Sequence, residues 1–385
     1  MRQPPIIIAT ITRPRGETGV QTHINAFAAY LRRKGLPWRL ITPYSYPKSA
    51  VYPVFAMRKI IDKLSGGLSV WWYRYWHGFF LQLALKPLLA RQEDCVIYAQ
   101  CPVSAAAALK ARSGVRQKIV LIVHFNISQA DEWAEKGRIA FGSKQYQSMR
   151  AFEETLLPRL DGLIFVSEFM RLELNRRIPA LRTLAQSVIP NFIADPGPAG
   201  AAALENKGDL IAIGSLESRK NQTYALDILA ELHRSGHPWT LDFYGDGPDR
   251  GLLQQKAAAL GLTSTVKFHG FRPDASAMLP YYRACLHTAK LENLPLTLIE
   301  ALAQGKPIFA ARQGGVGEII GPDGIAGRAI PLENPAQAAH IIAEALTDPN
   351  WPAMAAVEAR RRYQQFFAEE TAAAKLIDFL YRQLG

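Results

Sequence analysis

Cysteine is scarce in this 385-residue chain, which contains only Cys95, Cys101 and Cys285. An odd and sparse set excludes a disulfide framework and suits a reducing compartment such as the cytosol. Long hydrophobic runs are also missing, since no segment offers the roughly 20 uninterrupted apolar residues that cross a bilayer. The apolar run near the N-terminus has only five or six residues, too few for a signal peptide. We therefore expect a cytoplasmic protein, at most peripheral on the inner face of the cytoplasmic membrane.

Several signatures of cofactor and metal sites are absent as well. No group of His, Cys and Asp residues has metal-ligand spacing, and there is no Asp-x-Asp pair of the kind that metal-dependent sugar transfer uses. The chain has no Walker loop, no three-glycine dinucleotide fingerprint and no Gly-x-Ser-x-Gly elbow. These absences predict a protein that requires neither a metal nor a cofactor.

Acidic residues are few in the first half only. Residues 1–195 hold 27 Lys and Arg against 13 Asp and Glu, whereas residues 196–385 hold 18 against 20. The two halves are therefore expected to meet different partners. The basic half could face nucleic acid, an anionic membrane leaflet or phosphate-bearing substrates.

The length predicts two domains, because a single core rarely exceeds about 250–300 residues. Short apolar runs alternate with amphipathic helical patterns, which predicts doubly wound α/β domains with parallel sheets. We expect domains at 1–195 and 196–364, with a linker at 195–208, facing each other across a cleft. A helix at about 365–385 could pack back on the first domain. Strands are expected at 5–11, 95–100, 118–124 and 162–167, and then at 209–215, 239–245, 266–270, 284–289 and 307–311.

Residues 51–91 interleave aromatic residues with Lys and Arg, and seven aromatic residues fall within positions 71–80. Such a helix could lie in a membrane interface, with its rings at headgroup depth and its cations on anionic lipid. It could equally consist of core helices that carry a few exposed cations. The sequence leaves both interpretations open.

The segment 290–310 carries the strongest chemical pattern. Glu292 lies in a loop after an expected strand, and Glu300 lies on the following helix. The N-terminus of that helix presents free N–H groups and partial positive charge, which suit a phosphate. A carboxylate one or two turns along could accept hydrogen bonds from a ribose, although a solvated helix face could also place Glu300 there.

A second pattern is Arg219 and Lys220, at a strand-to-helix turn where cations are unfavourable without an anion. They predict contact with a diphosphate. Weaker candidates are the glycine-bearing loop at 13–23, His124 at the end of a buried strand, and the glycine turns at 244–249, 268–273 and 312–320. Each of these could equally be a packed side chain or a tight turn.

Taken together, these motifs resemble glycosyltransferase family 4, retaining enzymes of the two-domain GT-B fold. The matching segments are GETGVQTH, the His-ended strand, FVSEFMR, VIPNFIAD, GSLESRKN, YGDGP, FHGF, LENLPLTLIEALAQGKP and GGVGEII. The resemblance implies catalytic roles for His124, Lys220 and Glu292. It also implies donor-binding roles for Gly19, Ser215, Arg219, Lys220, Gly245, Gly270, Phe271, Arg272, Glu292, Asn293, Leu294, Pro295, Leu296 and Glu300.

Three positions depart from the family pattern. Ser215 stands where an Arg is usual, Thr18 precedes Gly19 where two glycines are usual, and Leu294-Pro295 replaces Phe-Gly. Because proline has no N–H, Pro295 removes one amide donor from the expected phosphate site.

The resulting hypothesis is a retaining glycosyltransferase of the hexosyl or N-acetylhexosaminyl class. It would use a nucleotide-sugar, a UDP-sugar rather than a GDP-sugar, and a glycan or lipid-linked acceptor in bacterial surface polysaccharide synthesis. We expect an anionic membrane surface, and no nucleic acid, among its partners. Two rivals are an epimerase or hydrolase of sugar nucleotides on the same fold, and a non-catalytic protein that binds nucleic acid or anionic lipid.

Overall fold

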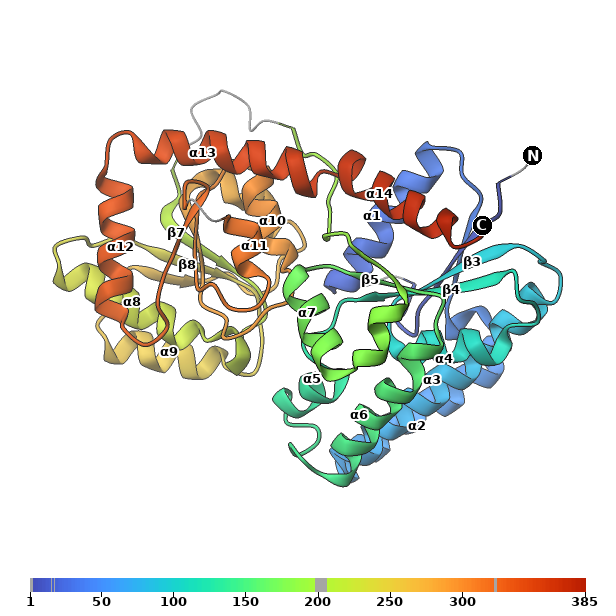
Figure 1. Ribbon diagram of the computed structural model, residues 1–385. Coiled ribbons are helices and arrows are strands. Elements are labelled where there is room, and N and C mark those ends of the chain that lie inside the picture. Colours follow the sequence, from blue (N-terminus) through green and yellow to red (C-terminus); the bar gives the residue numbers. More distant parts are fainter. Residues whose placement is uncertain (1–2, 15, 17, 198–205, 322–323) are drawn as a thin grey trace. The chain divides into compact units, whose positions relative to one another are not determined.

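The computed structural model in Figure 1 describes residues 3–14, 16, 18–197, 206–321 and 324–385. The chain divides into two compact units, with unit 1 formed by residues 1–190 and 372–385 and unit 2 by residues 191–371. Each unit is built on a six-stranded parallel sheet with helices between the strands, so the predicted α/β class is confirmed. The chain enters unit 2 shortly before the expected boundary at 195/196. Most of the expected linker, residues 198–205, lies outside the described residues, and the expected cleft stays a prediction.

The sheet of unit 1 has the order β2-β1-β3-β4-β5-β6. Its central strands are almost wholly apolar and buried, as expected where helices cover both faces of a parallel sheet. The strands are β1 Ile6–Ala9, β2 Trp38–Ile41, β3 Cys95–Ala99, β4 Gln117–Val123, β5 Gly162–Phe165 and β6 Ala185–Val188.

Helices cover both faces of this sheet. In Figure 1, α1 (Gly19–Arg33) and α14 (Glu369–Arg382) lie on one side, and α2 (Lys48–Leu64), α3 (Gly66–Leu89), α4 (Pro102–Ala111) and α6 (Lys144–Leu156) lie on the other. The remaining helices of unit 1 are α5 Gln129–Glu135 and α7 Glu168–Arg177. Within α14, Leu376 and Leu380 are completely buried, and residues 372–385 belong to unit 1.

The sheet of unit 2 has the order β12-β11-β10-β7-β8-β9. Its strands are β7 Gly208–Ile213, β8 Leu241–Tyr244, β9 Val266–Phe268, β10 Tyr282–His287, β11 Ile308–Ala310 and β12 Gly327–Ala329. Its helices are α8 Gln222–Arg234, α9 Arg250–Ala259, α10 Leu296–Ala303, α11 Val316–Ile320, α12 Pro335–Thr347 and α13 Trp351–Arg362.

Several helices begin or end at residues that are typical of helix ends. The Thr18 side chain accepts a hydrogen bond from the Gln21 amide, and the Gln21 side chain accepts one from the Thr18 amide, which forms a capping box at the start of α1. Gly35 follows α1 with a φ of 65°, and Pro102 is the first residue of α4. The residue choice at these ends therefore matches the backbone that each end requires.

The segment 51–91 forms α2 and α3, and it is buried on one side only. Val70, Leu81 and Leu85 are completely buried, which the core interpretation predicts. Trp71 and Tyr75 are about half exposed, at 50% and 51%. Among the described residues, no helix is long and apolar enough to cross a membrane.

Candidate functional site

The loops that follow β7 and β10 meet because these two parallel strands are neighbours, so their carboxyl ends share one edge of the sheet. The Lys290 amide donates to the Arg219 carbonyl over 3.1 Å. The Thr288 hydroxyl donates to the carbonyl oxygens of Lys220 (3.1 Å) and Asn221 (2.9 Å). Asn221 adopts a left-handed conformation with a φ of 54°. These bonds hold the turn that carries the two predicted cations.

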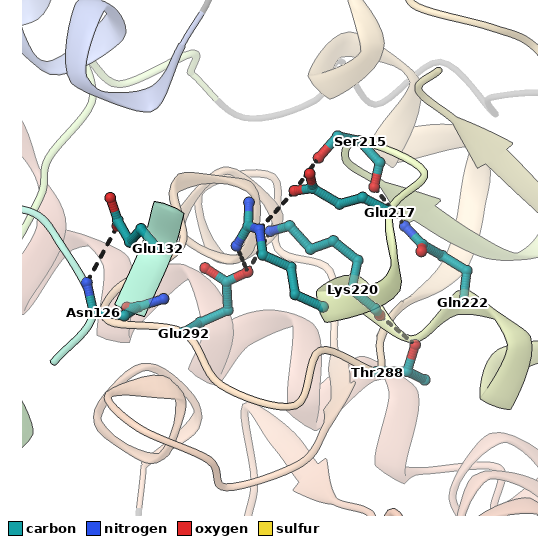
Figure 2. A network of polar contacts seen from close by, with 9 residues as sticks. Asn126, Glu132, Ser215, Glu217, Lys220, Gln222, Thr288 and Glu292 are labelled. Carbon is teal, nitrogen blue, oxygen red and sulfur yellow. Dashed lines mark hydrogen bonds and ion pairs between the residues drawn. The ribbon is translucent and has the colours of Figure 1, made fainter. Parts of the chain in front are cut away.

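Both cations point at one carboxylate, as Figure 2 shows for Lys220 and Glu292. Arg219 Nη1 lies 3.1 Å from Glu292 Oε1, and Lys220 Nζ donates to the same oxygen. Arg219 Nε also donates to Glu217 Oε1 over 2.6 Å, and the Ser215 hydroxyl donates to that oxygen over 2.8 Å. The structure thus joins four predicted site residues, Ser215, Arg219, Lys220 and Glu292, in one network.

Glu292 is 8% exposed, and its environment pulls its pKa in two directions. Burial alone would raise the pKa of this carboxyl, but Lys220, His287 and Arg219 together hold it below its ordinary value. Glu292 is therefore an anion at neutral pH that compensates two cations. Because each cation needs an anionic partner, a phosphate group could take the place of this carboxylate.

His287 lies at the end of β10 beside this network and is 7% exposed. Burial, with Lys220 and Arg219 nearby, lowers the pKa of His287 to about 4. The ring is therefore neutral at pH 7. Its Nε2 atom has no hydrogen-bond partner among the described residues. A buried polar atom without a partner is costly, so it suits a place where a ligand would supply one.

Three glycine turns meet at the carboxyl ends of β7, β8 and β9. The Gly245 amide donates to the Gly270 carbonyl over 2.9 Å, and the Gly214 amide donates to the Tyr244 carbonyl over 2.9 Å. A Cβ at Gly245 would lie 1.9 Å from the Gly214 carbonyl oxygen, and the φ of Gly245 is 151°. Only glycine fits this position, so the predicted residues Gly245 and Gly270 shape the edge next to the cation turn.

The segment from Glu292 to α10 is held by backbone contacts. Asn191 Nδ2 donates to the Leu294 carbonyl over 2.8 Å, and the Gly315 amide donates to the Glu292 carbonyl over 2.9 Å. Asn293 and Leu294 are buried, Pro295 precedes α10, and Leu296 is its first residue. The first turn of α10 contains no acidic residue, so its free N–H groups and partial positive charge remain available to an anion.

Glu300 lies within α10, away from the ion-pair network. Burial raises the pKa of this carboxyl to about 7. Burial therefore favours the protonated form of Glu300, and hydrogen-bond donors from a ligand would favour the ionised form.

Three further predicted residues are Phe271, Arg272 and Gly19. Phe271 is 54% exposed, and Arg272 is paired with Asp274 over 2.7 Å. Gly19 is the first residue of α1 in unit 1, while residues 15 and 17 of its loop lie outside the described residues. Among the described residues, the structure shows no hydrogen bond or ion pair between Phe271 or Arg272 and the network around Glu292, and the predicted role of Gly19 stays a prediction.

His124 follows β4 in unit 1. Its Nε2 lies 3.3 Å from Gln100 Oε1, and its ring is 4.9 Å from that of His23. Burial lowers the pKa of His124 to about 3, so the ring is neutral and a weak base at pH 7. This environment favours a hydrogen-bonding role over proton transfer.

Sequence reasoning missed three residues of the network: Glu217, His287 and Thr288. A signal existed for His287, because it lies near the carboxyl end of the strand expected at 284–289, as His124 ends the strand expected at 118–124. Glu217 lies inside the motif GSLESRKN, but nothing in the sequence shows that it pairs with Arg219.

A cavity of about 450 Å³ opens beside this edge of the sheet, and neither Lys220 nor Glu292 lines it. Its walls include Asn221, Lys290 and Gln313, from the loops after β7, β10 and β11. Among the described residues, no three His, Cys, Asp or Glu side chains are grouped so that they could hold a metal ion.

Family models match both units. Residues 18–195 match "Glycosyltransferase Family 4", and residues 199–364 match "Glycosyl transferases group 1". Among curated proteins, the chain is 26% identical to a 2-deoxystreptamine glucosyltransferase of Streptomyces kanamyceticus, over 57% of this chain and 59% of that protein. It is 27% identical to an O-antigen chain mannosyltransferase B of Escherichia coli, over 57% and 61%. The chain thus spans about three-fifths of the length of these two relatives.

Solved structures share the fold at low sequence identity. A sucrose-phosphate synthase from Thermosynechococcus elongatus aligns with a TM-score of 0.73 and 18% identity, over 100% of this chain and 99% of that one. Anabaena HepE in complex with UDP-glucose aligns with a TM-score of 0.70 and 18% identity, over 99% and 100%. With both of its units matched and this fold, the chain belongs to the GT-B glycosyltransferases of group 1 and family 4.

Proposed function

We propose that this protein transfers a sugar from a nucleotide diphosphate donor, which binds at the carboxyl edge of the sheet of unit 2. The observation that carries the proposal is the pairing of Arg219 and Lys220 with Glu292. Two cations and a helix N-terminus beside one buried carboxylate suit a ligand that has both phosphates and hydroxyl groups.

Donor binding would exchange the partners in this network. The diphosphate replaces Glu292 as the anion beside Arg219 and Lys220, and the freed carboxylate accepts hydrogen bonds from hydroxyls of the transferred sugar. As the bond between the anomeric carbon and the phosphate oxygen breaks, negative charge grows on the diphosphate. Fixed cations and the N-terminus of α10 stabilise that charge without having to reorganise. Glu300 accepts hydrogen bonds from the ribose.

We further propose a retaining reaction by same-face attack, a UDP-sugar of the hexosyl or N-acetylhexosaminyl class as the donor, and transfer without a metal. The family and the names of similar proteins support these properties. Relatives that act on O-antigen chains and on lipopolysaccharide core support a glycan or lipid-linked acceptor in bacterial surface polysaccharide synthesis. Such an acceptor would bring the protein to the inner face of the cytoplasmic membrane.

Nucleotide protection against thermal unfolding tests the donor site, because a ligand that binds only the folded state raises the melting temperature. UDP, UDP-glucose, UDP-N-acetylglucosamine and GDP-mannose would be compared on the full chain. We expect protection by a uridine nucleotide, and we expect Lys220→Ala and Glu300→Ala to abolish it. The controls are Lys256→Ala and Glu344→Ala, which remove similar charges from surface ion pairs of unit 2.

The melting temperature of each variant without nucleotide shows whether it folds. If folded Lys220→Ala and Glu300→Ala proteins keep the protection, the donor is bound elsewhere and the site assignment is wrong. Loss of the donor sugar to water alone, with no dependence on any acceptor, would favour a hydrolase.

A further inference from the structure

A second candidate binding site lies in unit 1, in a groove between α3, α4 and α6. The groove has a volume of about 330 Å³. Its lining residues are Trp71, Arg74, Tyr75, Gly78, Phe79, Gln82, Val103, Ala106, Ala107, Lys110, Gln145, Ser148, Met149 and Phe152. Eight of these 14 have apolar or aromatic side chains, so the groove is suited to a largely apolar ligand.

Small residues keep the groove open at its base. Gly78 on α3 faces α4 so closely that an added Cβ would lie 3.0 Å from Val103 Cγ1. Ala106 and Ala107 continue this narrow wall along α4. Space therefore remains above the contact between the two helices, bordered by the larger side chains of α3 and α6.

The aromatic wall on α3 is exposed although it is large and apolar. Trp71, Tyr75 and Phe79 are 50%, 51% and 38% exposed. Their rings are nearly parallel, with centroids 5.3 Å and 6.4 Å apart along the helix. A contiguous run of such side chains costs free energy in water and marks an interaction site.

Neighbouring α2 also carries exposed apolar side chains, which are called the stripe below. Of the 18 large apolar side chains that are exposed among the described residues, eight fall between positions 52 and 79. The stripe includes Ile60 and Leu64, which are 56% and 76% exposed. Lys59 and Lys63 are exposed beside it, and the carboxylate of Asp62 is paired with Arg138. An apolar ligand that carries negative charge would match both properties of this surface.

The charges of the lining side chains indicate which class of ligand the groove would bind. The side chains that line the groove include the cations Arg74 and Lys110 but no carboxylate. Arg74 already donates to Gln129 Oε1 over 3.0 Å and lies over the Phe152 ring at 5.2 Å, whereas Lys110 is exposed at the groove. A glycan would need hydrogen-bond acceptors for its hydroxyls, and the groove offers few. A hydrocarbon chain with an anionic head needs only an apolar wall and a cation.

We propose that the groove binds the hydrocarbon chain of a phosphate-bearing amphiphile, with the chain along Trp71, Tyr75 and Phe79 and the phosphate at Lys110. This inference rests on the proposed function, because a lipid-linked acceptor would bring such a molecule to the protein. It adds a binding site in unit 1 that is separate from the residues of the donor network.

Monomeric dodecyl phosphate, kept below its critical micelle concentration, is the probe for the groove. Calorimetric titration of the full chain should show binding, and Ala106→Trp, which fills the groove from α4, should weaken it at least ten-fold. Ser148→Trp fills the groove from α6 and gives a second test should the first variant fail to fold. Leu172→Trp, which adds the same ring at an exposed position on α7, should bind like the unaltered protein.

The head group is tested separately. Lys110→Ala should weaken binding of dodecyl phosphate three-fold or more and leave binding of uncharged dodecanol unchanged, whereas Lys86→Ala, an exposed cation of α3 outside the groove, should affect neither. Equal binding of dodecyl phosphate by the unaltered protein and by folded Ala106→Trp and Ser148→Trp would overturn the proposal.

Two further arms separate the possible sources of the effect. Phosphatidylglycerol vesicles could bind the unaltered protein and the groove variants equally while the monomeric probe does not bind. That result would place lipid contact on the stripe around Ile60 and Leu64 and refute the proposed binding site in the groove. Protection by UDP should be unchanged in Ala106→Trp. If the probe binds while no nucleotide protects any form, the donor site fails and the groove stands.

Discussion

Replacing Lys220 by Met should destabilise unit 2 mainly because it leaves Glu292 as a buried anion. The two side chains are only 13% and 11% exposed, so solvent screens their interaction little. Removing one partner of a buried pair typically costs about 3–5 kcal/mol. Arg219 remains 3.1 Å from the same carboxylate oxygen, so the expected loss is about 3 kcal/mol. For a unit of this size, that loss corresponds to a fall of about 6–12 °C in melting temperature.

The pH dependence identifies the cause of this loss. With Lys220 present, the pKa of Glu292 is below its ordinary value, so the ion pair stabilises the fold at neutral pH and is lost as the carboxyl protonates in acid. Without Lys220, burial should dominate and raise the pKa of Glu292. Ionisation of this carboxyl then destabilises the variant as the pH rises. The difference from the unaltered protein should therefore shrink as the pH falls from 7 towards 4.5, the ordinary value for this carboxyl.

Scanning calorimetry of the full chain between pH 4.5 and 8 measures this difference. Lys256→Met is the matched control, because its ion pair with Asp227 is 29% and 35% exposed and should contribute less than about 1 kcal/mol. Adding Glu292→Gln to Lys220→Met should restore most of the lost stability. If Lys220→Met behaves like the control, or if its deficit neither shrinks at low pH nor responds to Glu292→Gln, the account of a buried, charge-compensated carboxylate is wrong.

Three other predictions concern Glu300, Gly245 and α14. Because burial raises the pKa of Glu300 to about 7, binding of a ribose to its ionised form should release protons and strengthen as the pH rises from 6 to 8. Calorimetric titration with UDP-glucose in buffers of different ionisation enthalpy measures the number of protons released. Glu300→Gln should remove this proton release. In urea unfolding, Gly245→Ala should lower the free energy of unfolding more than Gly236→Ala. Both glycines have a positive φ, but only at Gly245 would an added Cβ lie 1.9 Å from a carbonyl oxygen. Equal losses of free energy in the two variants would contradict the steric argument. Leu380→Ala should destabilise unit 1 by about 2–5 kcal/mol, measured by calorimetry against Leu172→Ala, which lies at an exposed site and should cost little.

The sequence sufficed for the interior of both sheets but for only one of their four edge strands, β9. Every expected strand is present, while β2, β6 and β12, which were not predicted, are all edge strands. An edge strand is covered on fewer sides, so it does not need a continuous apolar run. The WRLI sequence of β2 and the GRA sequence of β12 accordingly lack the pattern that identified their neighbours.

The candidate site was predictable in composition but not in pairing. Arg219 and Lys220 stood out because cations are unfavourable at the start of a helix without an anion, and Glu292 stood out because it lies in a loop between an expected strand and a helix. Whether the two cations pair with Glu292 depends on β7 and β10 being neighbours in the sheet, which a separation of 72 positions between Lys220 and Glu292 does not reveal. The sequence also did not predict that the two carboxyl groups have opposite environments. Ion pairs lower the pKa of Glu292, whereas burial raises the pKa of Glu300 to about 7.

The return of residues 372–385 to unit 1 has a consequence for biosynthesis. Unit 2 is an insertion in unit 1, and near its two ends Ile193 pairs with Ala368, so the outgoing and returning segments run side by side. A ribosome delivers almost all of unit 2 before α14, which covers one face of the first sheet together with α1. We therefore expect unit 2 to complete its folding first on the nascent chain. Unit 1 is translated earlier, but one face of its sheet stays partly exposed, and accessible to chaperones, until α14 has been synthesised.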